Sequence, residues 1–94
     1  MKSRADIKDF VEIPNVGDAT ARYLRMLGLN EPFELVGRDP YLMYDELCGI
    51  AGKGFDPCLL DVFISSVRFM EGAAPRKWWY YTEERKARLN DQHG

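Results

Sequence analysis

The stretch "IPNVGDATA", residues 13–21, contains the residue types from which a turn that binds an anion can be built. Pro14 ends any helix before it, because a proline excludes the α conformation from the preceding residue. Asn15 tolerates the positive φ of a tight turn, and Gly17 has no Cβ to keep another molecule away from the backbone. The amides at the following helix start would be unpaired donors. With the helix dipole behind them, they predict a phosphate site.

Two arginines beyond this turn could widen the site. Arg22 and Arg25 lie about one turn apart on the expected helix, where they could flank a track of phosphates. Arg22 also follows Asp18 by four residues, a spacing at which a surface ion pair contributes about 0.3–0.5 kcal/mol. Both interpretations stay open. The turn itself could equally be a structural element that packs two helices without a ligand.

A run of aromatic residues near the C-terminus follows two cations. In "RKWWYY", Arg76 and Lys77 precede Trp78, Trp79, Tyr80 and Tyr81. Aromatic rings beside cations can form a platform on which bases stack. A chain this small also needs large aromatic side chains to close its core. We therefore expect this run to be buried, with one ring left exposed; the alternatives are a stacking platform and an anchor for a protein partner.

No combination of residues indicates catalysis. The sequence lacks a Ser/His/Asp set, a Walker-type glycine loop and an HExxH motif, so we expect no enzyme. The only histidine is His93, and Cys48 and Cys58 fall short of the four ligands of a tetrahedral metal site. We predict no metal site and no cofactor, and interpret the cysteines as buried thiols on neighbouring helices. The carboxylates are expected at helix caps and on outer faces.

The charge of the chain is unevenly distributed. The 94 residues carry a net charge of −2, with a pI of about 5.3, which argues against a protein that coats nucleic acid by bulk electrostatics. Residues 31–75 contain three Lys/Arg against eight Asp/Glu, residues 1–30 five against four, and residues 76–94 five against three. An anionic partner should therefore meet the two ends of the chain rather than its middle.

The size and hydropathy of the chain predict one small cytoplasmic domain. Its composition, 46% hydrophobic and 30% charged, is ordinary for a folded protein. No apolar run has the roughly 20 residues that a membrane span needs, and the N-terminus lacks a signal-peptide pattern. We therefore expect no membrane partner. The oligomeric state does not follow from the sequence.

Helices must position these residues, because no segment alternates in polarity for long enough to form a strand. Asp39–Pro40 and Asp56–Pro57 are typical cap-and-proline helix starts, and Gly52 is a typical stop. Ser3 and Thr82 are further candidate caps. The helices are predicted over residues 3–13, 18–27, 32–36, 40–51, 57–71 and 82–89. Their inner faces are expected to contain Ile7, Phe10, Val11, Ala21, Leu24, Leu27, Met43, Leu47, Ile50, Ala51, Leu59, Val62, Phe63, Val67 and Met70.

The turn and the helix after it resemble a known motif. "IPNVGDATARYLRMLGL" is similar to the helix-hairpin-helix motif, which binds the DNA backbone and has the usual form apolar-Pro-Gly-apolar-Gly-x-x-Thr-Ala. The resemblance implies DNA phosphate contacts from Asn15, Val16, Gly17, Ala19 and Thr20, with support from Arg22 and Arg25. The chain departs from the motif where Asn15 replaces a glycine, and where Asp18 places a negative charge beside the expected phosphate.

The resemblance extends over roughly residues 10–81. "DPYLMYDELCGIAGKGFDPCLLDVFISSVRFMEG", followed by "KWWYY", is similar to the small bacterial pathogenicity-locus family of helix-hairpin-helix proteins, whose members are often labelled mitomycin-resistance proteins. This implies an all-α, compact domain of five to six helices of the helix-hairpin-helix (SAM-like) type. We place this domain in residues 1–81, with residues 32–71 burying the hairpin. Residues 82–94 are expected to form a charged C-terminal helix or tail.

The resemblance implies a module for double-stranded DNA. The expected function is weak binding of the phosphate backbone without sequence specificity, in DNA repair or in resistance to DNA damage by mitomycin. The alternative is an adaptor that uses the same helical scaffold to bind a protein partner and does not bind DNA.

Overall fold

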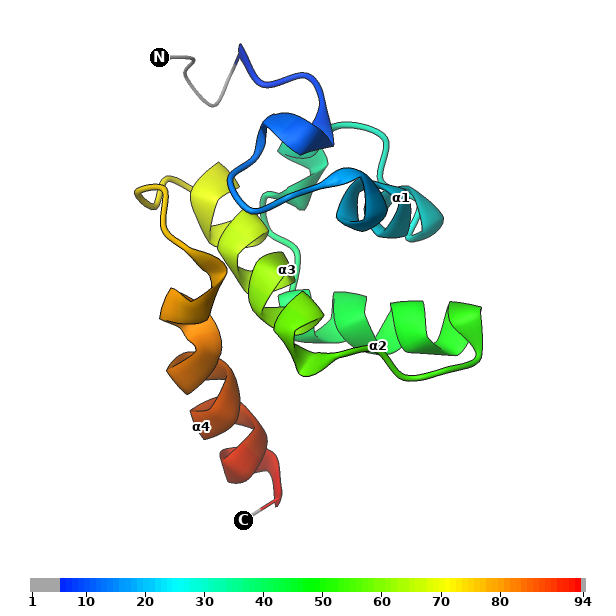
Figure 1. The fold of residues 1–94 in the computed structure, drawn as a ribbon, viewed down its shortest axis with the longest axis vertical. Coiled ribbons are helices and arrows are strands. Elements are labelled where there is room, and N and C mark those ends of the chain that lie inside the picture. The colour runs from blue at the N-terminus through cyan, green and yellow to red at the C-terminus, as the bar shows by residue number, and fades with distance from the viewer. Residues whose placement is uncertain (1–5, 94) are drawn as a thin grey trace.

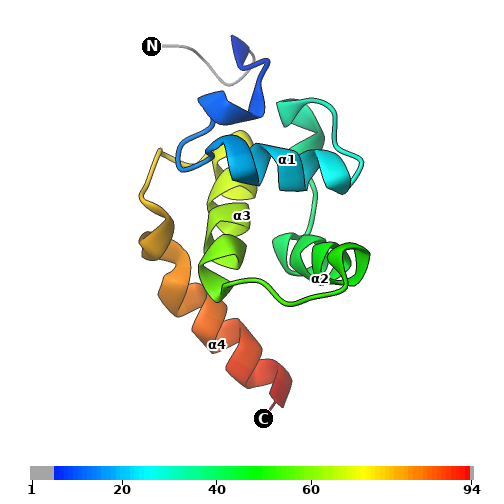
Figure 2. The ribbon, with the colours of Figure 1, turned by 45° about the vertical axis from the view of Figure 1, so that its right-hand side comes forward.

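Helix α3 (Pro57–Met70) runs through the middle of the molecule, with other elements on several sides of it (Figure 1 and Figure 2). The computed structural model describes residues 6–93, with side chains up to residue 89. As predicted, Asp56 caps α3: its carboxylate accepts a hydrogen bond of 2.8 Å from the amide of Cys58. Nine of the 14 residues of α3 are buried, so this helix forms the centre of the core.

Helix α2 (Pro40–Ala51) packs against α3 and begins in the same way. The carboxylate of Asp39 accepts a hydrogen bond of 2.9 Å from the amide of Tyr41. The helix ends at Gly52, whose φ of +69° lies in the left-handed region that glycine favours. Both ends agree with the prediction from sequence.

The last turn of α2 differs from its predicted packing. Met43 and Leu47 are buried as expected, but the side chain of Ile50 is 57% exposed. The C-terminal end of α2 extends away from α3 (Figure 1). The inner face of α2 is therefore shorter than its hydrophobic pattern suggests.

Replacing Gly49 with alanine is expected to raise the free energy of unfolding by about 0.5–1 kcal/mol. Gly49 lies inside α2 and is exposed, and no atom lies within 4 Å of the position that its Cβ would take. Alanine therefore gains helix propensity without a clash. Chemical denaturation checks this, with Gly52→Ala as a control that should destabilise because of its positive φ. A Gly49→Ala protein no more stable than the parent would contradict the prediction.

The N-terminal segment differs most from the prediction. The sequence predicts a helix over residues 3–13, but the described part of this segment contains 3-10 turns and no α-helix. The turn η2 (Phe10–Glu12) is the element that precedes residues 13–17. Ile7 and Phe10 are buried as expected, whereas Val11 is exposed.

A side chain explains why no longer helix forms there. The carboxylate of Glu12 folds back and accepts hydrogen bonds from the amides of Lys8 and Asp9, at 2.8 and 3.1 Å. This capping box fixes the start of the turn at Asp9, and Pro14 leaves room for one turn only. The predicted pair of α-helices around residues 13–17 is therefore a 3-10 turn followed by an α-helix. Ser3, the predicted cap, lies outside the described residues.

Helix α1 (Asp18–Met26) corresponds to the second predicted helix. It ends as predicted at Gly28, which has a φ of +87°. The amide of Leu29 donates a hydrogen bond of 3.2 Å to the carbonyl of Leu24, which closes the helix in a Schellman motif. The start of α1 is thus held by the preceding turn, and its end by its own last residues.

Three further elements complete the described chain. The third predicted helix is a 3-10 turn, η3 (Pro32–Leu35). The turn η4 (Trp78–Tyr81) continues directly into α4 (Thr82–His93), so Thr82 does not cap a separate helix as predicted. Residues 6–93 therefore form four α-helices and 3-10 turns without a strand, which confirms the all-α class. None of the described helices is both long enough and apolar enough to cross a membrane.

The core has two parts that share α3. The larger part joins η2, α1, η3, α2 and α3 through residues such as Phe10, Leu24, Leu35, Leu47 and Phe63. Residues from the segment 32–71 thus bury the turn and α1, as expected. The smaller part, between α2, α3 and η4, consists of Tyr41, Leu60, Ile64 and Tyr81.

One carboxylate is buried, although the sequence analysis places the carboxylates at caps and outer faces. Asp61 in α3 is fully buried and accepts hydrogen bonds of 2.7 Å from the hydroxyl of Thr82 and from Nε of Arg85. The hydrogen bond between Arg85 and Asp61 raises the pKa of the Arg85 guanidinium. The Asp61–Arg85 pair fixes α4 against α3.

Candidate nucleic-acid interface

The turn at residues 13–17 has the backbone that the sequence predicts. Ile13 and Val16 are both buried, and the amide of Val16 donates a hydrogen bond of 3.1 Å to the carbonyl of Ile13. Asn15 between them has a φ of +74°, which confirms its predicted left-handed conformation. Val16 therefore supports the turn from inside, and its own amide is already paired.

The side chain of Asn15 connects the turn to two distant parts of the chain. Its amide nitrogen donates hydrogen bonds to the hydroxyl of Ser65 in α3, at 3.0 Å, and to the carbonyl of Arg76, at 2.6 Å. These partners are 50 and 61 residues away in sequence. The sequence predicts the left-handed backbone conformation of Asn15. It does not predict that the side chain of Asn15 anchors the turn.

The start of α1 after the turn is open. Gly17, Asp18 and Ala19 are exposed and Thr20 is half-buried. Within the described part of the chain, the amides of residues 17–20 donate no hydrogen bond, and no side chain caps the helix. The Asp18 carboxylate does not close the site. No atom lies within 4 Å of a Cβ placed on Gly17, so its backbone is accessible to a ligand.

The two arginines of α1 have different surroundings. Arg25 forms an exposed ion pair of 3.5 Å with Asp9 and lies over the ring of Phe10, 5.7 Å from its centroid. It therefore holds η2 against α1. Arg22 is exposed and, within residues 6–93, forms no ion pair with Asp18. Of the two, Arg22 has its guanidinium available for an anion.

A basic segment lies beside the turn. Pro14 and Asn15 line a cleft of about 350 Å³ together with Pro75, Arg76 and Lys77. Both cations are exposed. The sequence indicated this basic segment through its distribution of charge, because both ends of the chain are basic and its middle is acidic. The fold joins the beginning of the basic C-terminal segment to the turn at Asn15.

The aromatic run divides into one buried, one half-buried and two exposed rings, which corrects the expectation of one exposed ring. Trp78 packs against the larger part of the core and Tyr81 belongs to the smaller part. Trp79 and Tyr80 are each 58% exposed. A 3-10 turn has three residues per turn, so Trp78 and Tyr81, which are three residues apart, lie on one side of the turn, and the two rings between them point elsewhere.

The cysteines are half-buried and free of disulfides. The carboxylate of Asp56 raises the pKa of the Cys58 thiol through a hydrogen bond, with burial adding to the effect. The same position at the helix start lowers the pKa of Asp56, because the backbone amide of Cys58 donates to its carboxylate. A thiol with a raised pKa is a poor nucleophile at neutral pH. Among the described side chains, which end at residue 89, no three of His, Cys, Asp or Glu come together as a metal site.

The fold and the site together define a small all-helical domain in which a turn beside a basic segment leads into an open helix start. The chain belongs to the family described as "Cdd1: Pathogenicity locus", whose model matches residues 3–87, and this confirms the resemblance found in the sequence. It is 41% identical over 85 residues to the mitomycin resistance protein McrB of Streptomyces lavendulae. The aligned region covers 90% of this chain and 81% of that protein. No solved structure matches the chain.

Proposed function

We propose that this protein is a non-enzymatic module that binds the DNA phosphate backbone weakly and without sequence specificity. The observation that supports this most directly is the open start of α1, which directly follows the turn that shares a cleft with Arg76 and Lys77. Backbone donors at a helix start, together with nearby cations, suit a phosphate group. The relative named as a mitomycin resistance protein supports a role in the protection of DNA against damage.

In the proposed complex, the amides of residues 17–20 donate hydrogen bonds to phosphate oxygens of one strand. Arg22, Arg76 and Lys77 supply positive charge on either side. Asn15 and Val16 fix the turn rather than contact the phosphate through their own amides. Because the contacts are few, the dependence of binding on salt should be shallow, with a log–log slope of roughly −1 to −3.

Replacing Gly17 with alanine is expected to weaken DNA binding about tenfold while leaving the fold intact, since a hydrogen bond to a charged group contributes about 1.5–3 kcal/mol. The added Cβ meets no atom of the protein, and the φ of Gly17, −99°, suits any residue. The methyl group stands where the phosphate approaches the amides. Fluorescence anisotropy with a labelled duplex at low salt measures the loss.

Two variants serve as controls for this experiment. Gly49→Ala makes the same chemical change at an exposed glycine of α2, away from the proposed site, and should bind as the parent does. Asp18→Asn removes a negative charge from the helix start and should bind more tightly. If Gly17→Ala and Gly49→Ala bind duplex DNA equally well, the amides of α1 do not hold the backbone and the proposal fails.

A second candidate is an adaptor for a protein partner. It is favoured by four strongly exposed apolar side chains in the acidic middle of the chain: Phe33, Val36, Leu42 and Ile50. Backbone amide shifts in a titration with duplex DNA distinguish the two functions. Shifts at residues 16–20 support DNA binding, whereas shifts that appear only on dilution of the protein support self-association instead.

A further inference from the structure

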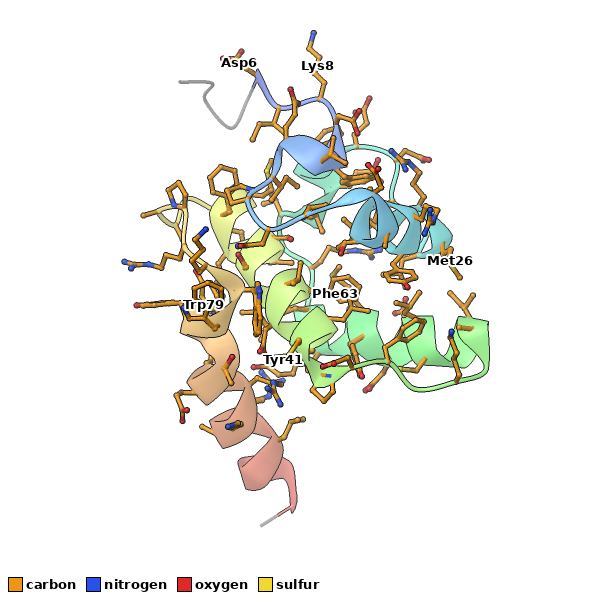
Figure 3. The ribbon with its side chains drawn as sticks, in the orientation of Figure 1. Asp6, Lys8, Met26, Tyr41, Phe63 and Trp79 are labelled. Atoms are coloured by element: carbon orange, nitrogen blue, oxygen red, sulfur yellow. The ribbon has the colours of Figure 1, made fainter. Side chains whose placement is uncertain are left out.

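The rings of Trp79 and Tyr80 are exposed, although large aromatic side chains would help to fill the core of so small a protein. Trp79 and Tyr80 follow one another in η4 and are each 58% exposed, and Figure 3 shows Trp79 on the outer side of this turn. Exposed large aromatic side chains are typical of binding surfaces. The neighbours of these rings, Trp78 and Tyr81, already contribute to the core. Burial therefore does not account for the exposed pair.

Both exposed rings are held in place by neighbouring side chains. Trp79 meets Trp78 edge to face, with 5.4 Å between ring centroids, and Tyr80 meets Tyr81 in the same way at 5.1 Å. Each exposed ring therefore rests on a more buried one. Such rings lose little conformational freedom when a flat ligand stacks on them.

Cations accompany both rings. The guanidinium of Arg76 lies 4.2 Å from the centroid of Tyr80, and Nζ of Lys77 lies 5.9 Å from the centroid of Trp79. Aromatic rings interleaved with cations are the combination that binds single-stranded nucleic acid: the rings stack on bases and the cations attract the backbone. The charge of this surface thus favours a polyanion as its occupant.

The rings lie next to the proposed phosphate site. The carbonyl of Arg76 accepts the hydrogen bond from Asn15, so the segment that leads into η4 is attached to the turn at residues 13–17. Pro14 and Lys77 line the same cleft. The segment that carries the exposed rings therefore lies against the turn that leads into α1.

We propose that Trp79 and Tyr80 stack on unpaired bases of the strand whose phosphates α1 holds, so that the preferred substrate is DNA with a single-stranded segment. This inference rests on the proposed function. In an intact duplex the faces of the bases are covered by their neighbours, and only an unpaired segment presents a free face to a protein ring. A duplex with a single-stranded tail offers both a backbone and free bases.

The experiment compares a blunt duplex, the same duplex with a single-stranded tail, and the tail alone. We expect the parent protein to prefer the tailed duplex, and Trp79→Ala or Tyr80→Ala to weaken binding of the tailed duplex about tenfold with little effect on the blunt one. Phe33→Ala is the matched control, because it removes another exposed aromatic ring, 63% exposed, from η3. In a Trp78→Phe background Trp79 is the only tryptophan, and its fluorescence should be quenched by the tail.

The outcomes separate the two proposals. If Gly17→Ala weakens the blunt duplex but the tail adds no affinity, or if Trp79→Ala acts on both duplexes equally, stacking is excluded and the proposed function stands. If no DNA binds to any variant, both proposals fail. Binding in which the tail preference disappears with Trp79→Ala and persists with Phe33→Ala supports the stacking surface.

Discussion

Replacing Asp61 with alanine is expected to lower the free energy of unfolding by about 3–5 kcal/mol. The carboxylate of Asp61 is fully buried and accepts hydrogen bonds from Nε and Nη2 of Arg85, at 2.7 and 3.4 Å, and from the hydroxyl of Thr82. The side chain of Arg85 is only 12% exposed. Without Asp61 the guanidinium loses its partner while it remains largely out of water, and this is the main source of the loss.

Urea denaturation of Asp61→Ala, Arg85→Ala and the double variant measures this effect. The free energy of unfolding of the double variant should fall by less than the sum of the two single decreases, because the second change removes a charge that the first left unpaired. The matched control is Glu84→Ala. Glu84 pairs with Arg68 at 2.8 Å and also joins α3 to α4, but the side chains are 40% and 39% exposed. The free energy of unfolding of Glu84→Ala should fall by less than about 1 kcal/mol. Equal decreases for Asp61→Ala and Glu84→Ala would contradict the prediction.

Replacing Asn15 with alanine should destabilise the protein by about 2–4 kcal/mol for two separate reasons. The φ of +74° strains alanine by about 1–2 kcal/mol, whereas asparagine tolerates this left-handed conformation. The variant also loses the two hydrogen bonds of the side-chain amide, to the hydroxyl of Ser65 and the carbonyl of Arg76. Each such bond contributes about 0.5–1.5 kcal/mol.

Asn15→Gly separates the two contributions. Glycine accepts the left-handed backbone but supplies no side chain, so it should be more stable than Asn15→Ala by about 1 kcal/mol and still less stable than the parent. Ser65→Ala removes a single acceptor and should have the smallest effect of the three. Denaturant midpoints measured under the same conditions rank the variants. Equal stabilities of Asn15→Gly and the parent would show that the side chain does not anchor the turn.

The helices that begin with a local signal could be predicted from sequence. At α2 and α3 the cap is an aspartate followed by proline, and the carboxylate bonds to an amide two residues on. All the atoms involved lie within three residues, so the signal is independent of the rest of the fold. The same holds for Gly28 and Gly52, which end helices through their own positive φ.

The two segments where helices were predicted and 3-10 turns occur share one cause. Glu12 and Glu34 each fold back on the amides that precede the turn, at residues 8–9 and 30–31. An acidic residue at the third position of a turn was readable as a capping box, but the hydrophobic spacing of the segment suggested a longer helix. In the N-terminal segment, the capping box and Pro14 outweighed the hydrophobic pattern.

The site was predictable only in its local part. The backbone of Asn15 and the open amides of α1 follow from residues 13–21 alone. The partners of Asn15 and the separation of Trp79 and Tyr80 from their buried neighbours depend on contacts between segments far apart in sequence. Asp61 was missed for the same reason, because its partners Thr82 and Arg85 come from a helix 21 to 24 residues later.

Asn15 also determines what an incoming anion encounters. A loop that closes on a ligand loses conformational freedom, at about 1–2 kcal/mol for each residue that becomes ordered. Here one side-chain amide has already joined the turn, α3 and the chain at Arg76 before any ligand is present. In the proposed complex with DNA, the backbone donors therefore need no rearrangement before they meet a phosphate. The strength of the complex is then set by the number of contacts rather than by the entropy of assembling them.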